Sequence, residues 1–239
     1  MRFPSLLLLT SVVAASWLAP EAGAQDAGGI SSSAISRCAG KFGLDTRQSD
    51  AAFGAIALDG VPWVTIERTE DMVGAQAITT TVTGTGAQRR RDGTFVPFRF
   101  TCVLDAKGEA LMFHTSHLIP RLGDVLPPSI VVGGSAATPE KTPLPRGTEL
   151  RVQLLDIAKS PAGEILTEQV VRSGWQAPIP FALHLPKDTS LEGRKLAITA
   201  RLVVLHQVLF QLKEPHVLAA DALRKPVDLT LAKVAAGER

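Results

Sequence analysis

The sequence contains no tyrosine, and phenylalanine and tryptophan together supply 5% of its 239 residues. Few side chains are therefore available for stacking on nucleic-acid bases. A large excess of one charge is also missing, because the chain has 25 basic and 23 acidic residues and a formal net charge of +2. This small excess could not neutralise a phosphate backbone. We therefore expect no nucleic-acid partner.

A hydrophobic run long enough for a membrane-spanning helix is absent as well, since such a helix needs roughly 20 apolar residues. The most apolar stretch, residues 5–19, is shorter and ends at Pro20. Arg2 precedes this stretch, and a small-residue cleavage sequence ending at Ala24 follows it, which is typical of a secretory signal peptide. We expect cleavage after Ala24, no transmembrane segment in the mature chain, and a periplasmic or secreted protein.

Cysteine is limited to Cys38 and Cys102. Ile35, Ser36 and Arg37 precede Cys38, so the chain has no lipobox and we expect no lipid anchor. Neither cysteine belongs to a C-x-x-C motif and no histidine lies near Cys38, which disfavours a catalytic thiol pair or a metal site. An exported pair with no thiol left over predicts a structural disulfide.

The composition, with 45% hydrophobic and 20% charged residues, is typical of a folded protein. In residues 25–119 the spacing of apolar residues predicts one helix around 34–42 and then strands near 64–66, 78–82, 95–104 and 110–113. The sequence thus predicts a small α+β domain in which the disulfide joins the helix to a sheet.

Prolines and glycines are concentrated in residues 120–145, which we interpret as a linker leading into the first strand of a second domain. Within it, residues 133–135 (Gly-Gly-Ser) are interpreted as a bend. Residues 146–234 show six or seven short alternating segments separated by turn residues, which predicts an antiparallel β-sandwich. The fold class is therefore mainly β, and we expect the two domains to be separable by proteolysis in the linker.

The second domain, about residues 130–234, resembles the YbaY-like lipoproteins, a family that includes the YscW-type pilotins. The segments that carry the resemblance are LPRGTELRVQLLDI at 144–157, PIPFAL at 178–183, ITARL at 198–202 and VDLTL at 227–231. The resemblance implies a β-sandwich of the outer-membrane or periplasmic type without a catalytic centre. It also implies a role like that of pilotins, which help an outer-membrane secretin to localise or assemble.

No motif in the sequence aligns a nucleophile with a base, and we expect no catalytic residue, cofactor or metal. His114 and His117 are three positions apart on an expected strand, so they face opposite sides and do not form a zinc pair. Asp156 and Arg201 are interpreted as a structural ion pair. The candidate contact residues are one tryptophan and a run of three arginines: Trp175, Arg89, Arg90 and Arg91. The alternatives are a tryptophan that covers a core and an arginine run that forms a solvated hairpin tip.

These observations favour an exported, non-catalytic envelope protein that binds an envelope protein or outer-membrane component. One alternative is a periplasmic carrier of a lipid or glycolipid, with an apolar slot between the sheets lined by Leu183, Leu202 and Phe210. A less favoured alternative is an enzyme with a site at the domain junction, built from His114, His117 and Asp156.

Overall fold

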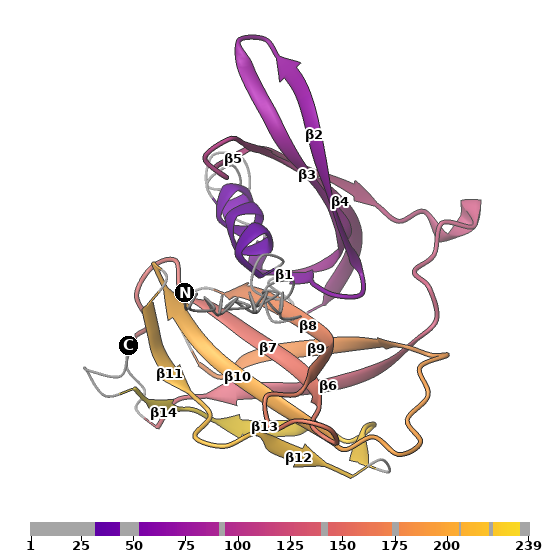
Figure 1. Cartoon of the computed structure of the whole chain (residues 1–239), viewed down its shortest axis with the longest axis vertical. Coiled ribbons are helices and arrows are strands. Elements are labelled where there is room, and N and C mark those ends of the chain that lie inside the picture. Colours follow the sequence, from indigo (N-terminus) through magenta and orange to yellow (C-terminus); the bar gives the residue numbers. More distant parts are fainter. Residues whose placement is uncertain are drawn as a thin grey trace, which may run out of the picture.

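A computed structural model describes residues 32–43, 53–90, 94–139, 143–173, 177–205, 207–219 and 222–234. The predicted signal peptide lies outside these residues. The described residues up to 117 form one helix, residues 32–43, and a curved antiparallel sheet that faces it (Figure 1). The strands of this N-terminal unit are β1 (Phe53–Asp59), β2 (Val64–Val73), β3 (Gln76–Arg90), β4 (Phe95–Asp105) and β5 (Ala110–His117). Figure 1 shows the β2–β3 hairpin projecting beyond the helix.

The remaining strands form a β-sandwich, reached through the short 3-10 helix η1 (Pro120–Leu122). One sheet of the sandwich has the order β13-β6-β9, and the facing strands β10, β7 and β8 belong to the large sheet of the molecule. The strands of this sandwich unit are β6 (Ser129–Ala137), β7 (Glu149–Asp156), β8 (Glu164–Ser173), β9 (Ile179–Pro186), β10 (Leu196–Val204), β11 (Gln207–Gln211), β12 (His216–Leu218), β13 (Val227–Thr230) and β14 (Ala232–Lys233).

Alternation of apolar and polar residues explains how each sandwich strand packs. In β9, every second side chain is buried, as expected of a strand with one face on a core. Leu150, Val152 and Leu154 of β7 point into the same core and are fully buried. The mainly β fold with one N-terminal helix is thus confirmed. One pair of strands, β6 and β13, is parallel, whereas alternation alone had suggested a wholly antiparallel sandwich.

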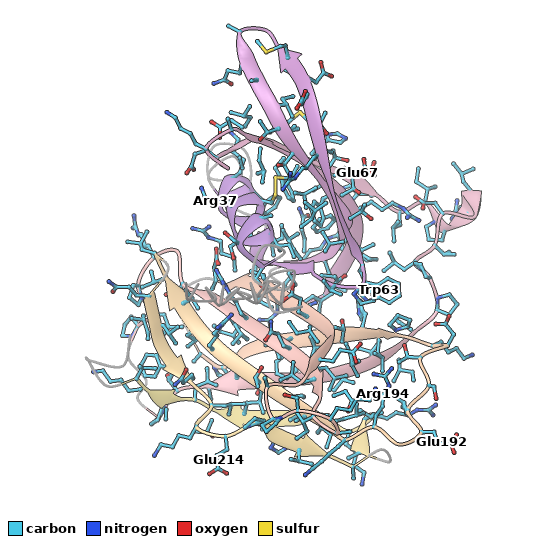
Figure 2. The ribbon with its side chains drawn as sticks, in the orientation of Figure 1. Arg37, Trp63, Glu67, Glu192, Arg194 and Glu214 are labelled. Carbon is cyan, nitrogen blue, oxygen red and sulfur yellow. A yellow bond between two sulfur atoms is a disulfide. The ribbon has the colours of Figure 1, made fainter. Side chains whose placement is uncertain are left out.

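The disulfide between Cys38 and Cys102 is confirmed, with Cα atoms 5.9 Å apart. Both cysteines are fully buried, and the yellow sulfur bond in Figure 2 joins the helix to the sheet. Around it, Phe113 of β5 packs edge-on against Phe42 and stacks on Phe100. The disulfide therefore crosses the core of the N-terminal unit.

The bend expected at residues 133–135 is wrong, because these residues lie inside β6 between β9 and β13. A Cβ atom added to Gly134 would lie 2.1 Å from the carbonyl oxygen of Val227 and 2.7 Å from the ring of Phe181. The close approach of the neighbouring strand therefore requires glycine at this position. Glycines in a row also occur in turns, so the local sequence does not distinguish the two settings.

The two units share one continuous sheet. Strand β1 pairs with β3 on one side and with β8 of the sandwich on the other, from Ala55 opposite Ser173 to Asp59 opposite Gln169. Leu58 faces the core of the N-terminal unit, while Ala57 faces the sandwich core. Each unit has its own hydrophobic core. The division into two domains, with a linker at residues 120–145, stays a proposal. A ladder of backbone hydrogen bonds between β1 and β8 joins the two units.

Candidate binding groove

The sandwich strands β7, β8 and β10 carry polar residues on the face opposite their core. Here the positions that alternate with the buried leucines are charged or polar, among them Arg151, Gln153, Glu168, Thr199 and Arg201. The N-terminal helix covers part of this outer face, because Ser32 donates a hydrogen bond to Glu168 (Oγ to Oε2, 2.8 Å) and Arg151 donates one to Ser36 (Nη2 to Oγ, 2.8 Å). The outer face is therefore partly buried although it is polar.

The carboxylates on the outer face are held by several partners. Glu168 is 2% exposed and also accepts a hydrogen bond from Gln153 (Nε2 to Oε2, 3.1 Å). Glu149 lies 3.7 Å from Arg151 and 3.6 Å from Arg172. Ion pairs and hydrogen bonds of this kind offset part of the cost of burying charge. Among the described residues, both glutamates thus have compensating neighbours.

Next to this network, a groove of about 860 Å³ opens over β7, β8 and β10. Its floor changes in character along the strands: Arg151 lies opposite Arg201, Gln153 lies opposite Thr199, and Leu155 follows. Since alternate residues of a strand are roughly 7 Å apart, the floor spans about 14 Å from its cationic to its apolar end. The walls come from other elements, including Val61, Gln211, Leu212 and Pro215.

Arg201 is half-buried in this groove and, across the described part of the chain, no ion pair or hydrogen bond reaches its guanidinium. Burial lowers the pKa of Arg201, and the charge of Arg151 opposite lowers it further, while Glu168 acts in the other direction. The Nε atom of Arg151 is buried without a hydrogen-bond partner. Arg201 thus has free donors at one end of the groove, beside Arg151, which already donates to Ser36 and pairs with Glu149.

The ion pair predicted between Asp156 and Arg201 is wrong. Asp156 instead lies 3.3 Å from Arg194 and accepts hydrogen bonds from the backbone amides of Ala158 and Lys195. The bond from Ala158 is the main cause of the lowered pKa of Asp156. The register places Leu196 opposite Asp156 and Arg151 opposite Arg201, so the two residues lie at different ends of the ladder.

A buried polar cluster at the junction of the units was missed by the sequence. Asp59 is 2% exposed and accepts hydrogen bonds from Thr85 (2.8 Å) and Gln169 (2.9 Å), with Nδ1 of His184 3.6 Å away. The hydrogen bond to Asp59 raises the pKa of His184, and burial opposes this shift. Trp63, labelled in Figure 2, donates from its indole to the carbonyl oxygen of His184. Asp59 followed by glycine had suggested only a turn.

The arginine run predicted as a contact lies at the end of β3, where Arg89 and Arg90 are exposed. Arg91 and Trp175 lie outside the described residues. Across the sheet, Arg89 is paired with Ala55, and Ala55 is paired with Ser173 of β8. The arginines therefore lie near the end of the strand that precedes Trp175 in the sequence, and all four contact residues stay predictions.

The residues of the enzyme alternative are not brought together. His114 and His117 lie exposed on β5 at one edge of the large sheet, and β8, β1, β3 and β4 separate this strand from Asp156 on β7. Among the described residues, no group of three His, Cys, Asp or Glu side chains is placed to hold a metal ion.

The side chains proposed to line a lipid slot have other roles. Leu183 and Leu202 are fully buried in the sandwich core, and Phe210 packs against that core from β11. A groove lies instead on the outer face, over Arg151 and Arg201. No helix within the described ranges is long and apolar enough to cross a bilayer.

Comparison with known proteins adds a family match for the sandwich unit. Residues 127–231 match the model of the family described as "Type III secretion system lipoprotein chaperone (YscW)", in agreement with the resemblance noted from the sequence. A solved structure titled as an alternative pilotin from the type II secretion system of Vibrio cholerae is similar, with 20% identity and a TM-score of 0.41. This match covers 45% of the present chain and 99% of the other. No curated protein matches the chain.

Proposed function

We propose that this protein is an exported, non-catalytic accessory factor in the assembly of a secretion system. The observation that carries the proposal is the match of residues 127–231 to a family of secretion-system lipoprotein chaperones. By this proposal the sandwich unit binds an outer-membrane component of the secretin type in the periplasm. By this proposal the chain has no lipid anchor of its own, as the residues before Cys38 lead us to expect, and its delivery depends on binding.

The contact surface proposed for this partner comprises Trp175 and the arginine run. Aromatic and arginine side chains supply much of the binding energy in protein interfaces. The exposure of Arg89 and Arg90 at the end of β3 supports the assignment, as does the pairing of β3 with β1 and of β1 with β8, the strand that ends before Trp175.

Co-expression with the secretin encoded in the same genome tests this function. We expect the full chain to be exported, to lose residues 1–24 and to co-purify with the secretin from the membrane fraction. The Trp175→Ala variant should associate more weakly with the secretin, by about 1–2 kcal/mol. The double variant His114→Asn, His117→Asn should associate as the wild type does. Failure of a folded, exported chain to associate with the secretin would refute the proposal.

A further inference from the structure

The groove over β7 and β10 has an ordered chemistry that neither the fold nor the family match explains. Its floor proceeds from two arginines through an amide and a hydroxyl to a leucine, over about 14 Å. In the sandwich core, by contrast, the opposite faces of the same strands are uniformly apolar. Arg151 and Gln153 also serve the fold, through hydrogen bonds to Ser36 and Glu168, whereas no hydrogen bond from the described residues reaches Arg201.

Arg201 is the least explained residue in the groove. Its cross-strand neighbours are Arg151 on β7 and Gln211 on β11, and burial of its guanidinium costs solvation without an ion pair from the described residues. Glu168 offsets part of its charge, and Glu149 is shared between Arg151 and Arg172, so three arginines face two carboxylates and an added anion would be favourable here. Two guanidinium groups on adjacent strands suit an oxyanion, because each can donate several hydrogen bonds in one plane.

The remainder of the floor selects the kind of anion. An acyl chain would place the Thr199 hydroxyl and the part of the Gln153 amide not bonded to Glu168 against hydrocarbon, and burying polar groups without partners costs free energy. A free phosphate would leave the apolar end at Leu155 empty. An extended peptide meets all three requirements, because its backbone can hydrogen-bond to the amide and hydroxyl while alternate side chains reach the floor.

We propose that the groove binds an extended peptide segment of the partner, with an acidic side chain between Arg151 and Arg201 and an apolar side chain at Leu155. Four residues of extended chain span roughly 14 Å, and residues four apart on a strand point to the same side. The segment therefore carries an aspartate or glutamate and, four positions along, an apolar residue. This inference rests on the proposed function, since it assigns part of the partner's binding to a defined site.

Selection from a displayed library of random heptapeptides tests the groove directly. The target is the chain from Gln25 onward, and the selected peptides are then synthesised and titrated by fluorescence anisotropy. We expect the selected sequences to share an acidic residue and an apolar residue four positions apart. Absence of any enriched peptide, or enrichment without the acidic residue, would overturn the inference.

Arg201→Gln is the informative variant because no hydrogen bond from the described residues is lost with it. We expect its affinity for the selected peptides to fall at least tenfold while its melting temperature equals or exceeds that of the wild type. Arg224→Gln, which removes the same charge from an exposed site in the sandwich unit, is the matched control and should bind normally. Equal binding by Arg201→Gln and the wild type would refute the proposed site.

Two further probes separate other occupants from a peptide. If decanoate or inorganic phosphate binds to the wild type but not to Arg201→Gln, and no peptide binds, the groove takes an acyl or phosphate ligand and the proposal is wrong. Peptide binding that requires deletion of residues 25–30 would show that the chain's own leader fills the groove, and would also overturn it. If Arg201→Gln still co-purifies with the secretin, the proposed function stands and only the groove assignment fails.

Discussion

The N-terminal unit closes its core with one helix and a disulfide, whereas the sandwich unit closes its core with a second sheet and contains no cysteine. A single helix covers only a narrow part of a curved sheet, and the hydrophobic core beneath it is correspondingly small. The sandwich buries residues from both facing sheets along several strands. The comparison indicates that the first unit depends on a covalent constraint and the second on close packing.

Removal of the disulfide should have the largest effect and should act on one unit. The loop closed by Cys38 and Cys102 spans 64 residues, and constraining a loop of this length in the unfolded chain stabilises by about 4 kcal/mol. Replacing both cysteines by serine should therefore lower the free energy of unfolding by about this amount in denaturant titrations.

Hydrogen exchange would locate that loss. In the double serine variant, backbone amides of β3, β4 and β5 should lose protection, while amides of β7, β9 and β10 keep most of theirs. An equal loss of protection in both units would show that they unfold as one body and that the comparison is wrong.

Close packing in the sandwich is tested at Gly134. The Gly134→Ala variant should destabilise the protein by about 3 kcal/mol, because its Cβ would meet the backbone of β13. Gly133→Ala is the matched control in the same strand, since the nearest atom to its Cβ is 3.9 Å away. Thermal or denaturant unfolding of both variants gives the measurement, and equal effects at the two positions would contradict the packing argument.

The polar cluster between the units predicts a smaller, pH-dependent effect. Because Asp59 raises the pKa of His184 above its ordinary 6.5, the protonated imidazole contributes stability that is complete below pH 6.5 and lost as pH rises through the raised pKa. His184→Gln should therefore destabilise the protein more at pH 5.5 than at pH 8.

Unfolding of the wild type, His184→Gln and His216→Gln at both pH values provides the measurement. His216 lies exposed on β12, so its replacement controls for loss of an imidazole elsewhere. A pH-independent difference between wild type and His184→Gln would show that the contact with Asp59 carries no charge-dependent stability.

The smallest effect is expected at the segment that connects the units. Arg99 of β4 holds this segment through Asp124 at 2.9 Å and through the carbonyl oxygen of Val125. An exposed ion pair contributes at most about 1 kcal/mol, so Arg99→Gln should barely change stability. Trypsin should nevertheless cut faster after Arg121, which lies in the exposed helix η1.

The cleaved protein also tests the separation of the units. If the β1–β8 ladder joins them as described, the two fragments should co-elute in size-exclusion chromatography until denaturant is added. Fragments that separate at once would indicate two independent domains, as the sequence had suggested. Resistance to cleavage throughout residues 120–145 would argue for one fused core.

Several elements could be predicted because their signals are local. The 3.6-residue spacing of Ile35, Cys38 and Phe42 indicates a helix, and alternation around Phe98, Phe100 and Cys102 indicates a strand. Long-range pairing leaves no such signal. Strand β1, which joins the two units, was not predicted, and residues 133–135 carry the glycines of a turn although they form the middle of β6.

The binding groove shows the same limit for function. Arg151 and Arg201 lie 50 positions apart in the sequence, and only the register of β7 with β10 makes them neighbours. The sequence had paired Arg201 with Asp156, since opposite charges near two similar strands suggest an ion pair. In the observed register Arg151, and not Asp156, lies opposite Arg201.

By itself the sequence determined the mainly β composition, the disulfide between its two cysteines and the family resemblance of the second unit, because each depends on residue type, spacing or order. The tertiary structure decided that one sheet runs through both units, that β6 and β13 are parallel, and that two arginines share a groove. These features depend on which distant strands pair and in what register, and that choice follows from burying both cores together rather than from any local pattern.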